Sequence, residues 1–293
     1  MAINGDDNDR IFDIFDGDNA VLHPTTISGL SFEHGFADIG DGGDGGAIRS
    51  TESLILKNTV FSNNYAYLGG GAIHLDTKGK LSIASSTFLN NTALNGNGGA
   101  VYGQADGGIS IVKSLVSGNT APDLNGGGLY LLVPSSTGKP AGILVDGVTF
   151  LRNSAESGGG LWADVNQAKG KIIVKNSTFT DNGVTSSGGG LYLNNGPATV
   201  SGSTFSNNVA GTDGGGLASN ATNPLTTLTI KGSRFEGNAA TGNGGAIHLR
   251  HEVLASTRSL PRRSALDSAS AGTPRADDRH AARGARGSRC RSR

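Results

Sequence analysis

One pattern of residues recurs eight times along this chain and constrains its fold more than any other feature. It consists of an apolar run ending in Phe, an Asn three residues later, and a glycine pair that opens a second apolar run. Residues 171–193, KIIVKNSTFTDNGVTSSGGGLYL, contain one whole copy, and successive copies lie 26 to 34 residues apart. A single copy of this length cannot bury its apolar face alone, so recurrence at such a period predicts a solenoid of stacked coils.

Two positions of the repeat have a predicted structural role, and we name them the anchor and the corner. Anchors are expected to stack on one another inside the coils, and seven of the ten Phe in the chain occupy this position. Corner Asn side chains are expected to pair from coil to coil at a turn that tolerates left-handed backbone. The anchors are Phe32, Phe61, Phe88, Val116, Phe150, Phe179, Phe205 and Phe235, and the corners are Gly35, Asn64, Asn91, Asn119, Asn153, Asn182, Asn208 and Asn238.

The apolar runs predict strands rather than helices. They are four to eight residues long, rich in β-branched and aromatic residues, and bounded by Gly, Asn and Ser. A strand that recurs once per coil pairs in parallel with its copies, and each glycine pair allows a tight turn with positive φ. We therefore expect an all-β fold, a right-handed parallel β-helix of about eight to nine coils. It should span residues 1–250, with an irregular capping coil at 1–25 and repeats at 26–250.

The charge distribution separates the C-terminal segment from the rest. Residues 251–293 contain ten Arg, no Lys and four acids, which leaves 14 basic and 20 acidic residues before them. The acidic body has no basic face for nucleic acid. The tail lacks Phe, Tyr and Trp, so we expect disordered or out-of-frame sequence, although a basic tail can also bind nucleic acid or an anionic membrane. Because the repeat ends in mid-coil, self-association through the exposed C-terminal coil is a further expectation.

Targeting signals are not expected within the sequence. Residues 1–20 have no basic segment followed by an apolar one, so no signal peptide is predicted. No apolar run is long enough to span a membrane. The single cysteine, Cys290, excludes an internal disulfide.

Acidic residues are concentrated near the N-terminus. Carboxylate oxygens bind calcium, so a calcium site in this acidic N-terminal coil is one expectation, and no other metal or cofactor is expected. The alternative is a solvated, charged end that protects the first sheet edge. The acids concerned are Asp6, Asp7, Asp9, Asp13, Asp16, Asp18, Asp38, Asp41 and Asp44.

Two short motifs resemble those of a known protein family. Residues 61–64, Phe-Ser-Asn-Asn, have the form Phe-x-x-Asn, and Gly-Gly-Ala-Ile occurs at 70–73 and 244–247. They resemble the repeat of the polymorphic outer-membrane proteins and related bacterial surface proteins over about residues 26–250. The resemblance implies a right-handed parallel β-helix that is extracellular or on the bacterial outer surface and acts mainly in adhesion.

A column of mostly aromatic residues follows the glycine turns. Its chain neighbours are apolar and should point inward, so the column should point outward. Three of the five Tyr and the only Trp fall on four successive coils, which predicts an exposed aromatic strip that binds a glycan or a host-surface protein. Stacked rings that only stabilise the strands are the alternative. With polar residues of two nearby connections, the predicted ligand-binding residues are His74, Tyr102, Tyr130, Trp162, Tyr192, Lys139, Asp164 and Asn166.

Three classes of function remain open at this point. An adhesin or glycan-binding module is the first, a polysaccharide lyase or hydrolase of the pectate-lyase-like β-helix type the second, and a purely structural surface spacer the third. A hydrolase needs two carboxylates about 5–10 Å apart. The outward column before the anchors contains one acid, Asp146, which should form an ion pair with Lys175 on the next coil. No catalytic residue is therefore assigned, and binding is favoured over catalysis.

Overall fold

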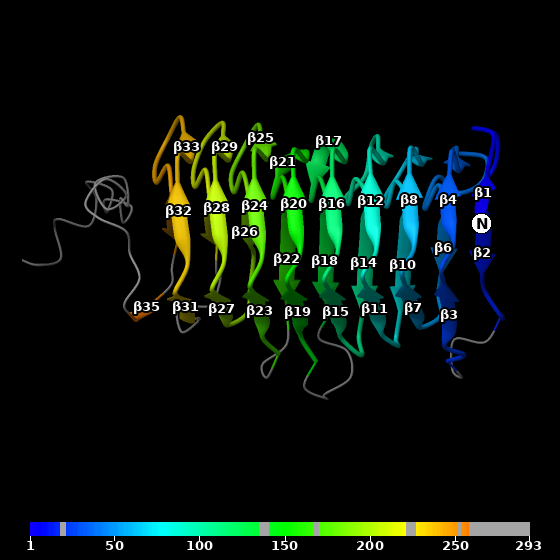
Figure 1. The fold of residues 1–293 in the computed structure, drawn as a ribbon, viewed down its shortest axis with the longest axis horizontal. Helices are drawn as coiled ribbons and strands as arrows, with labels where there is room; N and C mark the ends of the chain where they lie inside the picture. Colours follow the sequence, from blue (N-terminus) through cyan, green and yellow to red (C-terminus); the bar gives the residue numbers. More distant parts are fainter. Residues whose placement is uncertain (18–21, 135–140, 167–169, 221–226, 251–252, 258–293) are drawn as a thin grey trace, which may run out of the picture.

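The chain folds into a parallel β-solenoid with four sheets along its length. The sheets contain nine, nine, nine and eight strands, and neighbouring strands in each sheet are corresponding strands of successive coils (Figure 1). Every regular element in the described part of the chain is a strand. The fold class predicted by the repeat is thus confirmed. The computed structural model describes residues 1–17, 22–134, 141–166, 170–220, 227–250 and 253–257.

Each full coil passes through the four sheets in a fixed order, and we name the sheets by that order: leading, anchor, corner and aromatic. The leading sheet contains β3 (Thr25–Ser28), β7 (Leu54–Lys57), β11 (Leu81–Ala84), β15 (Ile109–Val112), β19 (Ile143–Asp146), β23 (Ile172–Lys175), β27 (Ala198–Ser201), β31 (Thr227–Lys231) and β35 (Val253–Thr257). The anchor sheet contains β1 (Ala2–Asn4), β4 (Ser31–Glu33), β8 (Val60–Ser62), β12 (Thr87–Leu89), β16 (Leu115–Ser117), β20 (Thr149–Leu151), β24 (Thr178–Thr180), β28 (Thr204–Ser206) and β32 (Arg234–Glu236).

The other two sheets complete the coil. The corner sheet contains β5 (Phe36–Ala37), β9 (Tyr65–Ala66), β13 (Thr92–Ala93), β17 (Thr120–Asn125), β21 (Ser154–Ser157), β25 (Gly183–Val184), β29 (Val209–Ala210) and β33 (Ala239–Ala240). The aromatic sheet contains β2 (Phe12–Ile14), β6 (Ile48–Ser50), β10 (Ile73–Thr77), β14 (Val101–Ala105), β18 (Leu129–Val133), β22 (Leu161–Val165), β26 (Leu191–Leu193), β30 (Leu217–Asn220) and β34 (Ile247–Arg250).

The anchors form the core, as predicted from their column. In the anchor strands from β4 to β32 the central residue is buried and its two neighbours are partly or fully exposed, which follows from the alternation of side chains along a strand. Rings on adjacent coils stack nearly parallel, for example Phe150 on Phe179 and Phe179 on Phe205, both with centroids 4.6 Å apart. Val116 occupies the same register between Phe88 and Phe150 and interrupts the stack of rings.

The corner Asn residues form a continuous hydrogen-bonded ladder inside the turn. Asn182 is typical: its Nδ2 donates to Asn208 Oδ1 at 2.9 Å and to the carbonyl of Phe150 at 3.1 Å. Its backbone N–H donates to the same Asn208 Oδ1 at 3.1 Å, and its own Oδ1 accepts from the backbone and the amide of Asn153. The predicted amide pairing is confirmed, and it also satisfies buried backbone groups of the turn.

One detail of the corner prediction is wrong. The corner Asn itself does not adopt left-handed backbone; the residue before it does, as at Asn63, Asn90, Arg152 and Asp181, with φ between 53° and 55°. The left-handed residue turns the chain while the following Asn places its amide inside. Because that preceding position faces solvent, its side chain varies, and only the buried Asn is kept in the repeat.

The glycine pairs fulfil two separate requirements. The first glycine of each pair has positive φ, for example 66° at Gly158, as the sequence predicted. The second glycine lies against the backbone of the next coil, so that a Cβ on Gly71 would overlap the carbonyl oxygen of Gly99. The pair therefore allows both the turn and the close approach of adjacent coils.

Regular strands occur at both ends of the solenoid. The first coil, expected to be irregular, contributes β1 and β2, which pair with β4 and β6, and the Phe12 ring lies edge-on against Phe32 at 5.7 Å. At the other end β35 lies beyond residue 250 and pairs with β31. Disorder was predicted for residues 251–293; β35 lies within this tail, and residues 251–252 and 258–293 lie outside the described residues.

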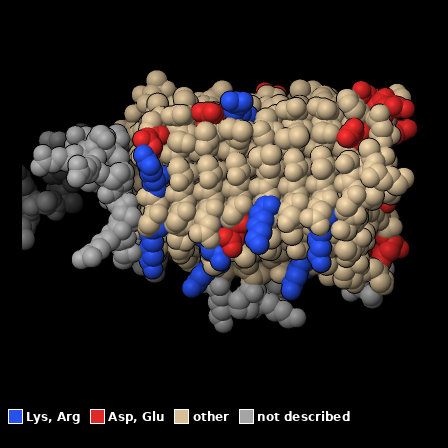
Figure 2. Space-filling model, in the orientation of Figure 1, with Lys and Arg blue, Asp and Glu red and all other residues tan. Residues whose placement is uncertain are grey.

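The surface over the anchor sheet is largely uncharged. Figure 2 shows acidic side chains gathered at the N-terminal end of this face and a middle region with few charges. On the leading sheet, Lys175 Nζ lies 3.2 Å from Asp146 Oδ2, which confirms the predicted ion pair and the register of that column.

Candidate ligand-binding site

The predicted aromatic column lies in one register across the aromatic sheet. Backbone pairing of β10, β14, β18, β22 and β26 aligns its five members, and their rings stack nearly parallel. The structure therefore brings together the five ring residues that the sequence predicted. The centroid distances are 4.5 Å for His74–Tyr102, 5.2 Å for Tyr102–Tyr130, 4.2 Å for Tyr130–Trp162 and 6.4 Å for Trp162–Tyr192.

The expected exposure of this strip is wrong. Trp162 is only 8% exposed, and the other four rings are half-buried. Each flat face of the indole is covered by a neighbouring ring, Tyr130 on one side and Tyr192 on the other, so only its edge is left. The strip consequently offers ring edges and hydroxyl groups to a ligand rather than open aromatic faces.

Burial also affects the ionisation of the stacked tyrosines. It raises the pKa of Tyr130 well above its usual range, and neighbouring Tyr102 and Asp164 raise it further. Burial likewise raises the pKa of Tyr102, with added contributions from Asp76 and Asp44. Both hydroxyls therefore remain protonated hydrogen-bond donors at neutral pH.

The three predicted polar partners have different outcomes. Asp164 lies beside the strip and is 7% exposed; its Oδ2 accepts hydrogen bonds from Asn194 at 2.8 Å and Asn195 at 3.3 Å. Its Oδ1 is buried and has no hydrogen-bond partner among the described residues. Asn166 is exposed beyond the end of β22, where its backbone N–H donates to the carbonyl of Val133. Lys139 lies outside the described residues.

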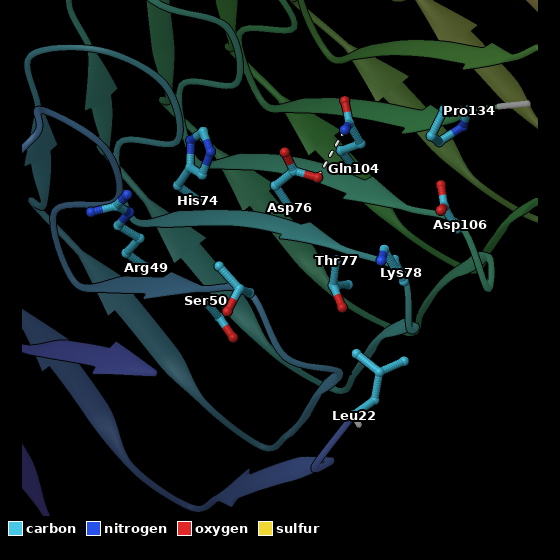
Figure 3. Close-up of a pocket in the computed structure, with 11 residues that line it drawn as sticks. Leu22, Arg49, Ser50, His74, Asp76, Thr77, Lys78, Gln104, Asp106 and Pro134 are labelled. Carbon is cyan, nitrogen blue, oxygen red and sulfur yellow. Dashed lines mark hydrogen bonds between the residues drawn. The ribbon is translucent and has the colours of Figure 1, made fainter. Parts of the chain in front are cut away.

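A cleft opens at the His74 end of the strip, over β6, β10 and β14. Its volume is about 520 Å³, and polar side chains of three successive coils form much of its lining (Figure 3). His74 is the one predicted site residue among those lining it. The cleft is lined by Leu22, Arg49, Ser50, Thr51, His74, Asp76, Thr77, Lys78, Gln104, Asp106 and Pro134.

Hydrogen bonds connect the cleft to the ring stack. Gln104 Nε2 donates to Asp76 Oδ1 at 2.8 Å, the contact drawn in Figure 3. The Tyr102 hydroxyl donates to Gln104 Oε1 at 3.3 Å. Asp76 and Gln104 are adjacent on one outward column, two residues beyond His74 and Tyr102 on their strands. The amide is thus held in one orientation by partners on both sides.

A second contact fixes the imidazole at the mouth of the cleft. His74 Nδ1 lies 3.0 Å from Asp44 Oδ1, at ion-pair distance but without the alignment of a hydrogen bond. The same carboxylate oxygen accepts the backbone N–H of Gly69 at 3.0 Å. Burial alone would raise the pKa of Asp44, but His74, the Gly69 amide and Arg49 together lower it below its usual value.

Several cleft residues were missed in the sequence. Asp76 and Gln104 lie in one column, two residues after the aromatic column, and that column continues through Leu132 to the predicted Asp164. The spacing of two residues after the aromatic column could have identified these side chains from the sequence. Lys78 and Asp106 come from connections after the strands, where the repeat places no fixed residue type.

Comparison with known proteins supports the repeat. Residues 58–76, 85–104 and 232–250 match the Chlamydia polymorphic membrane protein repeat. Each segment runs from just before an anchor strand to the end, or near the end, of the following strand of the aromatic sheet. No curated protein and no solved structure is significantly similar to the chain.

The matching repeat is that of a family associated with the bacterial surface and outer membrane. Among the described residues, no helix has the length and apolar character needed to cross a membrane. The chain is a parallel β-solenoid that contains repeats of the Chlamydia polymorphic membrane protein type.

Proposed function

We propose that this protein is a surface adhesin that binds a glycan in the cleft beside His74. The observation that carries the proposal is the cleft itself, which is large enough for a small saccharide and combines an imidazole, an amide and charged groups on three adjacent coils. Sugars present many hydroxyl groups, each of which can donate and accept. A lining that mixes carboxylates, amide and ammonium groups matches that pattern.

The charge of the lining favours a neutral glycan over an acidic one. Arg49 and Lys78 contribute two positive charges, and Asp76 and Asp106 contribute two negative charges. A site for sulfated or polyanionic chains would instead show an excess of Arg and Lys. The ligand class is therefore a neutral oligosaccharide, held by hydrogen bonds rather than by net charge.

The ring stack supports this site in two ways. It holds His74 against Tyr102 at 4.5 Å, which fixes the imidazole at the rim of the cleft. It also places the Tyr102 and Tyr130 hydroxyls along the aromatic sheet as protonated hydrogen-bond donors. A longer chain lying along the aromatic sheet would then contact both places.

A glycan array probed with the labelled full chain tests the proposal. We expect binding to neutral oligosaccharides, with affinity reduced about 3- to 10-fold by Gln104→Ala, the loss expected for one or two hydrogen bonds. The second cleft substitution, Lys78→Ala, should also weaken binding. Its matched control is Lys57→Ala, because Lys57 is an exposed lysine on the leading sheet, away from the cleft. Binding only to acidic glycans, or binding that neither cleft substitution weakens, would contradict the proposal. Absence of all binding would favour a structural spacer.

A glycan-cleaving enzyme is the second candidate, because two carboxylates, Asp76 and Asp106, line the same cleft. Glycosidases use such a pair as acid and base or nucleophile. The hydrogen bond from Gln104 holds Asp76 as an acceptor. Release of reducing ends from a bound glycan, abolished by Asp76→Asn or Asp106→Asn, would support this candidate. Binding without release in the wild-type chain would exclude it for that glycan.

A further inference from the structure

Three side chains with metal-binding atoms meet at the N-terminal end of the solenoid, beside the cleft. One ligand atom from each of Asp16, His23 and Glu52 lies within 4.8 Å of the others. Asp16 follows β2, His23 precedes β3, and Glu52 lies in the turn between β6 and β7. The cluster thus joins the first coil to the second.

Glu52 supplies the observation that distinguishes this cluster from an ordinary acidic surface. It is only 2% exposed, and its Oε1 is buried and has no hydrogen-bond partner in the part of the chain that the structure describes. Its Oε2 accepts the backbone N–H of His23 at 2.7 Å. A buried carboxylate with one unsatisfied oxygen is costly unless a cation or a donor compensates it.

The backbone around the cluster is held in place by several contacts. Thr51 N–H donates to the carbonyl of Ile14 at 3.2 Å, and Thr25 N–H donates to the carbonyl of Ser53 at 2.8 Å. The Ser50 hydroxyl bonds both the N–H and the carbonyl of Glu52, which fixes the turn. These bonds position the ligand atoms before any ion arrives.

We propose that Asp16, His23 and Glu52 bind a divalent transition-metal ion such as Zn²⁺. Calcium and magnesium take oxygen ligands, whereas an imidazole nitrogen with carboxylate oxygens is a ligand set for zinc and its neighbours. His23 Nδ1 and Asp16 Oδ2 lie 2.6 Å apart, at hydrogen-bond distance. The metal takes the place of that hydrogen bond, with the neutral imidazole carrying its one proton on Nε2 and offering the Nδ1 lone pair.

Among the residues that the structure describes, no other three His, Cys, Asp or Glu side chains bring their ligand atoms this close together. The Arg10 guanidinium bonds the carbonyls of Asp41, Asp44 and Gly45 and the side chain of Asp13. Calcium binding by the acidic N-terminal coil stays a prediction; the three-residue cluster shares Asp16 with those acids but also contains His23 and Glu52. Its ligand set differs by the nitrogen of His23.

Calorimetric titration of the full chain with ZnCl₂ and, separately, with CaCl₂ tests the proposal. We expect one-to-one Zn²⁺ binding that His23→Ala or Glu52→Gln weakens by roughly 10-fold or more. His34→Ala is the matched control, because His34 also lies beside an acid, at 3.2 Å from Asp7, but lacks a buried third ligand. Wild-type Zn²⁺ affinity in the His23→Ala variant, or no stoichiometric binding by the wild type, would overturn the proposal.

A thermal melt provides the second measurement and guards against misfolded variants. Zn²⁺ should raise the melting temperature of the wild type and of His34→Ala, but not that of Asp16→Asn, whose metal-free melt serves as the folding control. Equal stabilisation by Ca²⁺ and Zn²⁺ would show that the imidazole is not a ligand and would also overturn the proposal.

Discussion

Replacement of Asn182 by Ala tests how much the corner ladder contributes to the stability of the solenoid. The substitution removes four hydrogen bonds: two donated by Nδ2, to Asn208 and to the Phe150 carbonyl, and two accepted by Oδ1 from Asn153. Asn182 is 1% exposed, so the groups that lose their partners are buried. The hydrogen bond from the backbone N–H of residue 182 to Asn208 can remain.

The expected cost follows from the groups left without partners. These are the backbone N–H and one amide hydrogen of Asn153, and the Phe150 carbonyl, which loses this donor. At about 1–3 kcal/mol for each unsatisfied buried group, and with water able to enter the space of the deleted amide, the free energy of unfolding should fall by about 3–5 kcal/mol. Asn166→Ala makes the same chemical change at an exposed position and should cost less than about 0.5 kcal/mol.

Denaturant unfolding followed by Trp162 fluorescence measures this loss, since Trp162 belongs to the same coil as Asn153. Hydrogen exchange gives the sharper readout. The Asn153 amide should lose protection, while the Asn91 amide, bonded to Asn119 Oδ1 at 2.9 Å, should keep it because coils interact with their neighbours. An unchanged Asn153 exchange rate together with a stability loss below about 1 kcal/mol would refute the reasoning.

Three further predictions concern the core and the charged groups. Phe179→Ala leaves a cavity between the rings of Phe150 and Phe205 and should lower the free energy of unfolding, measured with denaturant, by about 3–5 kcal/mol. A decrease below about 1 kcal/mol would contradict the ring ladder as the main core. The folded state lowers the pKa of Asp44, so this carboxylate stabilises the fold above the ordinary carboxylate range and loses its contribution as pH falls below about 4. Asp44→Asn should therefore make the melting temperature less sensitive to acid. An unchanged dependence of the melting temperature on pH would refute this. The folded state raises the pKa of Tyr102 and Tyr130, so it keeps their protons and loses stability as pH rises above about 10. Spectroscopic titration should show at least two tyrosines that ionise only when the protein unfolds in alkali. Ionisation of all five tyrosines together near pH 10 would contradict the burial of the stack.

The sequence predicted the features that depend on one residue per coil. The anchor ladder, the amide ladder, the first glycine of each pair and the Asp146–Lys175 ion pair all follow from register, since parallel in-register strands place like residues side by side. A further column was readable but missed. Ser177 and Ser203, two residues before their anchors, also form a ladder, in which the Ser203 hydroxyl accepts the backbone N–H of Ser177.

The remaining features depend on neighbours that the repeat does not specify. Whether Trp162 is exposed depends on which rings cover its faces, and alternation along β22 gives only the side of the sheet. The cleft and the Asp16–His23–Glu52 cluster depend on the paths of connections that differ from coil to coil. The extension to β35 was missed because backbone pairing continues where the side-chain pattern has ended.

The direction of the corner ladder affects how such a gene can change. Every corner amide from Asn64 to Asn208 donates to the next coil, and each from Asn91 onward accepts from the coil before it. One coil can therefore follow another without a new complementary surface, so duplication or loss of a whole repeat in the coding sequence keeps the ladder intact. Each event changes the length of the rod by one strand spacing, about 4.8 Å. Duplication on the C-terminal side of the cleft would lengthen the protein and leave the residues that line the cleft as they are.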